Sequence, residues 1–297
     1  ALGAGLPVVT MNAEMQVVTG SYFVDKGYIT EAEGDQPGCL AALAEETEAM
    51  GFHPRVYGNV KGFLNHNPTI EEMEYWGARQ AITMQRVVSF TDGTKLQIEQ
   101  ALVANGLGAT IVADGLAGPR VETVEQARDE LVAVASRAEG PISDYVLSTS
   151  LPPGVFIIAT HPQYQEQRMF LRNYKLGDGP HYLFMRPYHL CHLEIVKTLR
   201  RVVAGGPPLL NNSSRPGVSV AAVAKRVLQS GHRIDHGIGS FDVRGIAVTF
   251  TGNRGHCPIG LLQGAVLVRG VEAGQIITMD DVELPETRAL TAWRDIC

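Results

Sequence analysis

Two side chains that could act together on a carbonyl group lie near the middle of the chain. Asp92 and Lys95 fall in the stretch 90–108, whose pattern predicts a helix that starts at Asp92 and ends at a glycine. The Asp92 carboxylate can accept hydrogen bonds from the first turn, and apolar residues from Ile98 onward recur at helical spacing, so this face packs inward. An ammonium beside a carboxylate at the mouth of a cleft can bind or protonate a developing alkoxide. We therefore predict that Asp92 and Lys95 are catalytic. The alternative is that Asp92 only caps the helix and Lys95 only extends into solvent.

Strands and helices alternate ahead of this helix. The pattern predicts strands at 6–11 and 28–32 and helices at 15–27 and 39–50. Short turns that contain glycine join them, and this order is typical of a parallel α/β sheet. Ligands of such sheets bind beyond the carboxyl ends of the strands. The residues at those ends, which we expect to bind a cofactor unless they only form turns and caps, are Asn12, Glu14, Gly34, Asp35 and Gln36.

A dinucleotide-binding fingerprint is missing from these turns. The Gly-x-Gly pairs at 106–108 and 237–239 do not lie between a strand and a helix, which the motif requires. The chain also opens without Met, on what looks like the end of a helix. We therefore expect an N-terminally truncated chain, in which the phosphate-binding turn either precedes residue 1 or does not exist.

The next part of the chain supplies candidate substrate-binding residues. The predicted elements are strands at 55–61, 87–90, 143–148, 155–160 and 181–186 and helices at 70–81, 121–138 and from about 189 to 201. Cationic side chains at strand ends, with polar neighbours, can hold an anionic or polar ligand. The expected substrate-binding residues are Lys61, Asn65, Arg186, Tyr188 and His189. His189 and His192 share a helix face, but no carboxylate motif accompanies them, so a divalent metal is possible but unsupported.

Composition narrows the class of protein. The formal net charge of −6 and the 19% of charged residues indicate no basic surface, so nucleic acid and acidic membranes are not expected as partners. No apolar run approaches the ~20 residues that span a bilayer. Four widely spaced cysteines form no Cys-x-x-Cys pair, which fits free thiols in the cytoplasm better than disulfides or a zinc site.

The last third of the chain has a different character. Residues 205–217 are rich in Gly, Pro, Asn and Ser, as linkers are. Short strands and turns follow, and the pattern of 224–234 recurs in 268–277. Two such halves must cover each other's apolar faces, so we expect one small β module rather than two domains.

Together these motifs resemble a known family. The patterns from Lys225 to Ile234 and from Val271 to Val282 are similar to the signatures of a SAF (β-clip) domain. The part before them resembles the NAD(P)-dependent oxidoreductases that carry this module. These are relatives of homoserine dehydrogenase and include deoxyxylulose-phosphate reductoisomerase-like enzymes. The likeness rests on the segments 8–14, 34–38, 59–62, 90–95, 186–190 and 258–260.

The resemblance implies roles for some of these residues. Homoserine dehydrogenases place an Asp and a Lys on the helix that follows the catalytic strand, and Asp92 and Lys95 look like that pair, one residue closer together. Where those enzymes have Ala-Asn-Lys, this chain has Asn-Ala-Glu at 12–14, a departure that bears on homoserine itself as the substrate.

The expected fold class is α/β, with the C-terminal part of a Rossmann-type parallel sheet, an α+β catalytic domain and a small β-rich SAF-like domain. The expected boundaries are 1–52 for the remnant of the nucleotide-binding domain, 53–206 for the catalytic domain, 207–217 for the linker, 218–288 for the SAF-like domain and 289–297 for the tail.

Three functions are compatible with this sequence. The first is an oxidoreductase that uses NADP or NAD to reduce a carbonyl of a small phosphorylated or anionic polyol. The second is a non-redox sugar-acid lyase or isomerase, because SAF-type modules also accompany sugar-acid dehydratases. The third is a carbohydrate-binding SAF-domain protein without chemistry. We expect a small-molecule substrate and a homo-oligomer, with neither nucleic acid nor a membrane as a partner.

Overall fold

The computed structural model describes residues 1–296. Its helical segments are η1 (Leu2–Ala4), α1 (Ala13–Met15), η2 (Gln16–Gly20), α2 (Ser21–Val24), α3 (Gln36–Ala49), α4 (Ile70–Gln80), α5 (Met84–Thr91), α6 (Thr94–Gly106), α7 (Val124–Ala135), α8 (Tyr164–Asn173), α9 (Cys191–Val203), η3 (Ile259–Leu261), η4 (Met279–Asp281) and α10 (Arg288–Ile296). Its strands are β1 (Val8–Thr10), β2 (Ile29–Glu31), β3 (His53–Lys61), β4 (Ile142–Leu147), β5 (Gly154–Thr160), β6 (His181–Arg186), β7 (Val218–Ala224), β8 (Arg233–Ile234), β9 (Val243–Thr249), β10 (Ala265–Leu267) and β11 (Val282–Glu283). The predicted mixed α/β class is confirmed.

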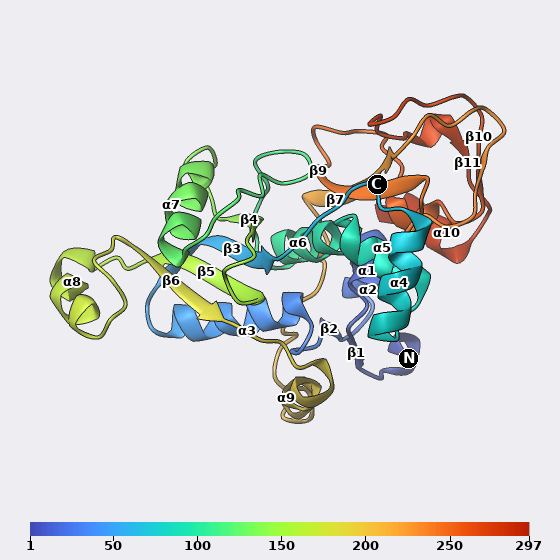
Figure 1. Cartoon of the computed structure of the whole chain (residues 1–297). Coiled ribbons are helices and arrows are strands. Elements are labelled where there is room, and N and C mark those ends of the chain that lie inside the picture. The colour runs from blue at the N-terminus through green and yellow to red at the C-terminus, as the bar shows by residue number, and fades with distance from the viewer. Residues whose placement is uncertain (297) are drawn as a thin grey trace.

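The largest sheet has the strand order β4-β3-β5-β6. Strand β3 pairs in parallel with β4 and antiparallel with β5, which pairs antiparallel with β6. Alternate side chains of β5 pack in opposite directions, with Val155 and Ile157 in the cluster that includes α3 and Phe156 and Ile158 in the cluster that includes α7. Figure 1 shows α7 and α3 on opposite faces of this sheet. Burial on both faces explains why β5 is a continuous apolar run.

Strands β1 and β2 form a separate parallel pair, with Val8 opposite Ile29. A continuous helical stretch of α1, η2 and α2 connects them, and η2 is a π-helical turn. The parallel order predicted for these two strands is confirmed, whereas the Rossmann-type identity of the sheet stays a prediction. Because the strands are parallel, both of their carboxyl ends lie at one edge, where the turns 11–12 and 32–35 meet.

Helix α6 runs through the interior of the molecule. It contacts α3, β4, β7 and β9 (Figure 1). The predicted inward face, from Ile98 to Asn105, is buried, but so are Gln97 and Gln100 on other faces. These glutamines are satisfied by backbone groups: the Gln97 side chain, for example, accepts from the Ala247 N–H at 2.8 Å. An interior helix of this kind needs partners for its polar side chains on every side.

Two elements differ from the sequence prediction. Residues 87–90, expected to form a strand, belong to α5, which buries Val87, Val88 and Ser89. A short apolar run has no periodicity that separates a strand from one turn of a buried helix. Helix α8 was not predicted; none of its residues is fully buried, and only the partly buried Tyr164 and Leu171 pack on the core.

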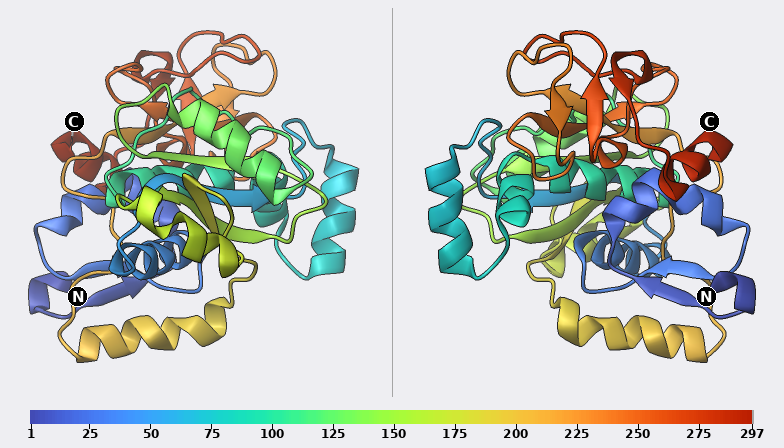
Figure 2. Two further views of the ribbon diagram at one scale, coloured as in Figure 1. Left: turned by 90° about the vertical axis from the view of Figure 1, so that its left-hand side faces the viewer. Right: turned by 90° about the vertical axis from the view of Figure 1, so that its right-hand side faces the viewer.

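The last third of the chain packs on α6. Strands β7 and β9 pair antiparallel, and β8, β10 and β11 form a small sheet. The two halves of the predicted module do meet, because Leu228 and Val271 exchange backbone hydrogen bonds of 3.0 and 2.9 Å. Leu228 lies in the same hydrophobic cluster as Ile98 and Leu102 of α6. Figure 2 shows this part of the chain against one side of the molecule. Its identity as a SAF domain and the domain boundaries stay predictions.

Residues 207–217, expected to be a linker, contain no helix or strand but are anchored at two places. The Leu209 N–H donates to Thr30 Oγ1 at 2.8 Å, which holds the segment beside β2. The Asn105 side chain of α6 donates to Asn212 Oδ1 at 2.9 Å and accepts from the Gly217 N–H at 2.9 Å. Within residues 1–296, no helix combines the length and the apolar character that crossing a bilayer requires.

Candidate active site around Lys95

The two parallel strands deliver carboxylates to one place. After β1, Asn12 caps α1, since its Oδ1 accepts from the Met15 N–H at 2.9 Å, and Glu14 lies in the first turn. After β2, Asp35 is the N-cap residue of α3, but its side chain makes no capping hydrogen bond. The carboxylates of Glu14 and Asp35 therefore remain available to the first turn of α6.

Lys95, in that first turn, lies among three carboxylates. Its Nζ is 3.3 Å from Glu14 Oε1, 3.5 Å from Asp35 Oδ2 and 3.5 Å from Glu99 Oε1. The Lys95 side chain is 16% exposed. Burial alone would lower the pKa of Lys95, but the attraction of Glu99, Asp35 and Glu14 outweighs it and raises the pKa above its usual range. Lys95 therefore keeps its positive charge across the neutral range.

Two of the acids near Lys95, Glu99 and Glu31, are buried and hold protons. Burial raises the pKa of Glu99 to about 8, although Lys95 works in the other direction. Burial, reinforced by Asp35, raises the pKa of Glu31 to about 9. Glu31 Oε2 accepts from the Gln16 amide in the π-helical turn, and Glu31 Oε1 has no hydrogen-bond partner among the described residues. At neutral pH both acids are mostly uncharged, which limits the negative charge that Lys95 must balance.

A cavity of about 740 Å³ opens in front of Lys95. This volume is typical of small-molecule sites. Helix α5 contributes Arg86, Ser89 and Phe90 to the lining of the cavity. Arg86 makes no ion pair with any described residue, so it is a second cation facing the same space. The lining residues that were predicted to bind cofactor or act in catalysis are Asn12, Glu14, Asp35 and Lys95.

A second cavity of about 480 Å³ lies on the other side of Phe90, which lines both. Its walls are apolar and include the exposed aromatic side chains of Phe63 and Trp76. Lys61, at the end of β3, also lines it and forms no ion pair within the described part of the chain. Burial lowers the pKa of Lys61, against the opposing attraction of Glu99 and Asp92. Lys61 thus faces a different cavity from Lys95, although Glu99 influences both.

Asp92 does not position Lys95, contrary to expectation. Its Oδ1 accepts from the Thr94 N–H at 2.8 Å, so the carboxylate does contact the first turn of α6, but Gly93 rather than Asp92 is the N-cap residue. Its Oδ2 lies 2.7 Å from Nζ of Lys225, and the two side chains are 0% and 3% exposed. The sequence did not indicate this pairing because the two residues are far apart in the chain. The catalytic role of Asp92 stays a prediction, without the contact that motivated it.

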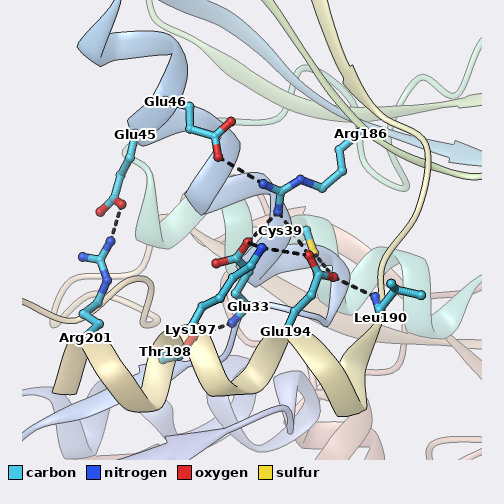
Figure 3. Close-up of polar contacts among 10 residues, drawn as sticks. All are labelled: Glu33, Cys39, Glu45, Glu46, Arg186, Leu190, Glu194, Lys197, Thr198 and Arg201. Atoms are coloured by element: carbon cyan, nitrogen blue, oxygen red, sulfur yellow. Dashed lines mark hydrogen bonds and ion pairs between the residues drawn. The ribbon is translucent and has the colours of Figure 1, made fainter. Parts of the chain in front are cut away.

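Arg186 is occupied by acidic side chains and lines neither cavity. Its Nη1 donates to Glu33 at 2.8 Å, its Nη2 donates to Glu46 at 3.2 Å, and Glu194 lies 3.7 Å away. Lys197 of α9 also contacts Glu33, at 2.7 Å. Figure 3 shows Arg186 pointing into this group, between α3 and α9. Substrate binding by Arg186 therefore stays a prediction, and in this structure its guanidinium is paired with acidic side chains.

Gly34 and Gln36 support the site without lining its cavity. Gly34 has φ +116°, and a Cβ there would lie 2.8 Å from Cα of Cys191, so only glycine fits between β2 and α9. The Gly34 carbonyl accepts from Cys191 Sγ at 2.9 Å. Gln36 Oε1 accepts from the Asn59 side chain at 2.6 Å, which ties α3 to β3. Their predicted role in cofactor binding stays a prediction.

The remaining predicted residues lie outside the cavity lining. Asn65 Oδ1 accepts from the Asn67 N–H at 3.1 Å and shapes its own loop. Tyr188 is 53% exposed, and His189 Nδ1 lies 4.0 Å from Cys191 Sγ. In residues 1–296, no three His, Cys, Asp or Glu side chains are grouped so that they could hold a metal ion. Substrate binding by Asn65, Tyr188 and His189 is thus left as a prediction.

The sequence reasoning missed several residues of the site. Glu99 carried one signal, because it lies four residues after Lys95 and so on the same helix face. Glu31 and Gln16 carried none, since each looks like an ordinary residue of a strand or a helix. Arg86 was not predicted because residues 87–90 were assigned to a strand, and a strand that starts at residue 87 does not indicate where the side chain of residue 86 points.

Comparison with known protein families identifies the family to which this chain belongs. A family model described as "Oxidoreductase DRL, catalytic domain" matches residues 34–195, which is more than half of the chain. The matched span includes Asp35, Lys61, Lys95 and Glu99. A search of curated proteins gave no match. The chain therefore belongs to the oxidoreductase DRL catalytic-domain family, and the protein is an oxidoreductase.

Proposed function

We propose that this oxidoreductase uses NADP or NAD to reduce the carbonyl of a small anionic polyol in the cavity in front of Lys95. One observation carries the proposal: a persistently charged ammonium faces a cavity of suitable size beside the ends of two parallel strands. A cation fixed where negative charge develops on oxygen is among the strongest sources of rate enhancement.

The donor set of the cavity fits the nicotinamide and ribose end of such a cofactor. Asp35 follows β2, and an acidic residue after a strand can accept from ribose hydroxyls in dinucleotide-binding folds. Its carboxylate makes no capping hydrogen bond, so it is available for that contact. A diphosphate is disfavoured next to Glu14 and Asp35 by charge repulsion. These residues therefore support contact with the uncharged part of the cofactor.

The chemistry of the chain's own residues follows from their charges. When bound, the reduced nicotinamide supplies a hydride. Lys95 Nζ donates a hydrogen bond to the carbonyl oxygen, stabilises the negative charge that develops there, and delivers a proton to it. Glu14 and Asp35, at 3.3 and 3.5 Å, hold Nζ at the cavity wall. The apolar body of Phe90 excludes water from the reacting groups.

Arg86 is the best candidate for the anionic end of the substrate. It lines the same cavity as Lys95, and no acidic side chain of residues 1–296 forms an ion pair with it. Arg186, the residue first expected in this role, is occupied by Glu33 and Glu46. A substrate with a carbonyl at one end and a phosphate or carboxylate at the other would match the positions of Lys95 and Arg86.

The family match supports this function over the two alternatives. A sugar-acid lyase or isomerase and a binding module without chemistry would each leave the redox character of the family unexplained. Nothing in the site favours either of them specifically.

The test combines cofactor titration with one substitution. NADPH and NADH are titrated into the protein while nicotinamide fluorescence is followed, and reduction of glyceraldehyde 3-phosphate serves as the probe reaction. Lys95→Met is expected to lower kcat by about 10²–10⁴-fold, because the cation at the oxygen is lost, while the cofactor still binds. The exposed Lys26→Met serves as the matched control. Absence of binding by both nucleotides, or wild-type turnover by Lys95→Met, would contradict the proposal.

A further inference from the structure

We infer that Lys61, Glu99 and Lys95 form a path that carries protons from the second cavity to the active cavity, with Glu99 as the relay. This inference rests on the proposed function, since it concerns the proton that carbonyl reduction consumes. Nothing in the family match assigns a role to Glu99 or to the second cavity.

The need for such a path comes from the position of Lys95. Its side chain is already only 16% exposed without any ligand, and that exposure is toward the active cavity. A substrate that fills this cavity covers Nζ on its open side. After Lys95 has given its proton to the product, a new proton must arrive from behind, through the protein.

Glu99 occupies the position behind Lys95. Its Oε1 lies 3.5 Å from Lys95 Nζ, and its side chain is 6% exposed, so solvent does not reach it directly. Charged and titratable groups from several elements act on Glu99. They are Lys95 on α6, Lys61 on β3, Asp35 at the N-cap of α3, Glu14 on α1 and Glu31 on β2. Of these, Lys61 is the group that also lines the second cavity.

Lys61 connects Glu99 to that cavity. The cavity is separated from the active one by Phe90, so a substrate in front of Lys95 leaves it open. Lys61 makes no ion pair within 4.0 Å in residues 1–296, so the proposed path from its ammonium to Glu99 runs through water. The cavity, at about 480 Å³, has room for such waters.

The proton balance of the path is simple. The reduction breaks the carbonyl π bond and forms one C–H and one O–H bond; both electrons arrive with the hydride. Lys95 gives one proton to the alkoxide and becomes a neutral amine. Glu99 gives its proton to Lys95 and becomes a carboxylate. Lys61 reprotonates Glu99 through water, and solvent in the second cavity reprotonates Lys61. One proton is taken up, and all three groups return to their starting states.

The electrostatics suit these roles. Burial raises the pKa of Glu99 to about 8, so at neutral pH it holds a proton to give. The pKa of Lys61 is lowered by burial, while the pKa of Lys95 is raised by the acidic side chains around it. Two lysines pushed in opposite directions by their surroundings are typical of groups that divide the work of charge stabilisation and proton transfer.

The first experiment follows Glu99 without any substrate. Infrared titration of the protein should detect a protonated carboxyl band that disappears as the pH rises through about 8 and is missing in Glu99→Gln. Glu31→Gln is the matched control, because it removes the other buried acid and should leave this band in place. In Lys61→Met the band should persist to higher pH, since the nearby cation is gone. A band unaffected by Glu99→Gln would overturn the inference.

The second experiment measures turnover of glyceraldehyde 3-phosphate with NADPH. Glu99→Gln should lower kcat by about 10–100-fold, leave KM within about twofold, and remove the dependence of kcat on the ionisation near pH 8. Lys61→Ala should show a smaller loss that added methylammonium partly restores, because a diffusible acid can enter the second cavity.

The outcomes separate this inference from the proposed function. If Lys95→Met abolishes turnover but Glu99→Gln keeps the wild-type pH profile, the proton path is wrong and the proposed function stands. If Lys95→Met turns over normally, the proposed function itself is wrong. Loss of activity in Glu99→Gln without any change in the pH profile indicates a merely structural role and also overturns the path.

Discussion

Two ion clusters meet at the turn that follows β2, and they differ in a way that separates structure from chemistry. Glu33 points to Arg186 and Lys197, whereas Asp35, two residues later, points to Lys95. Gly34 lies between them. Two acidic residues of a single turn therefore contribute carboxylates to two clusters with different properties.

In the cluster around Arg186, two cations, Arg186 and Lys197, share three carboxylates, those of Glu33, Glu46 and Glu194. Each of its cations contacts at least two carboxylates, and neither described cavity reaches it (Figure 3). In the group around Lys95, this single cation lies among three acidic side chains, those of Glu14, Asp35 and Glu99, and the group opens on a cavity. One buried acid there, Glu31, keeps an oxygen without a partner. Ion pairs without a cavity stabilise a fold, whereas an excess of buried acids beside a cavity costs stability and is retained for function.

The largest expected effect tests whether the Arg186 cluster is structural. Arg186→Met should lower the free energy of unfolding by about 3 kcal/mol, because Glu33 and Glu194 would be left buried near an insufficient positive charge. Urea denaturation measures it. The control is Arg172→Met, which removes an exposed pair with Asp178 and should have no measurable effect. NADPH binding should not change in either variant. If Arg186→Met instead keeps its stability and loses affinity for an anionic probe, the comparison fails.

The next effect tests whether the group around Lys95 costs stability. Glu31 has a pKa of about 9 in the folded protein and an ordinary value of 4.5. Between these pH values the unfolded chain loses the Glu31 proton while the folded chain keeps it. The contribution of Glu31 to the free energy of unfolding is therefore most favourable below pH 4.5 and declines as pH rises toward 9. Glu31→Gln should remove this decline and be more stable than the wild type at pH 8, by ~1–3 kcal/mol.

The measurement is the urea midpoint at several pH values between 5 and 9, with the exposed Glu283→Gln as the control. Parallel slopes for Glu31→Gln and the wild type would mean that this buried acid is not a source of instability.

The smallest effect concerns which cluster holds the anionic end of the substrate. Arg86→Met should raise KM for glyceraldehyde 3-phosphate about tenfold, equivalent to ~1.4 kcal/mol, with kcat nearly unchanged, because the contact is equal in the ground and transition states. The exposed Arg215→Met should leave both constants unchanged. A larger fall in kcat than rise in KM would move Arg86 from substrate binding to the chemical step.

Much of the fold could be predicted because it follows from local patterns of apolar residues in the sequence. The strands at the start of the chain, α3 and the large sheet have regular apolar patterns bounded by glycine and proline. Residues 87–90 could not be assigned, since four residues fit a strand and a helical turn equally well. Helix α8 was missed because only two of its apolar residues, Tyr164 and Leu171, pack on the core, and both are partly exposed.

The site was predictable only in part, for a physical reason. Lys95 and the strand-end residues Asn12, Glu14 and Asp35 follow from the rule that parallel strands converge at their carboxyl ends. Pairings between distant residues do not follow from any local pattern, so the partners of Asp92 and Arg186 were out of reach. Burial of a charge is likewise a property of the whole fold, which is why Glu31 and Glu99 looked ordinary in the sequence.

The buried pair of Asp92 and Lys225 has a consequence for engineering this protein. Helix α6 begins two residues after Asp92, and Lys225 directly follows β7, the first strand of the C-terminal part of the chain. A shortened chain that ends before β7 would leave the Asp92 carboxylate in the interior without its counter-charge and would strip the cover from Ile98 and Leu102. The C-terminal module therefore cannot be removed from the chain without destabilising the rest. A graft of this module onto a related enzyme must keep Asp92 and Lys225 together.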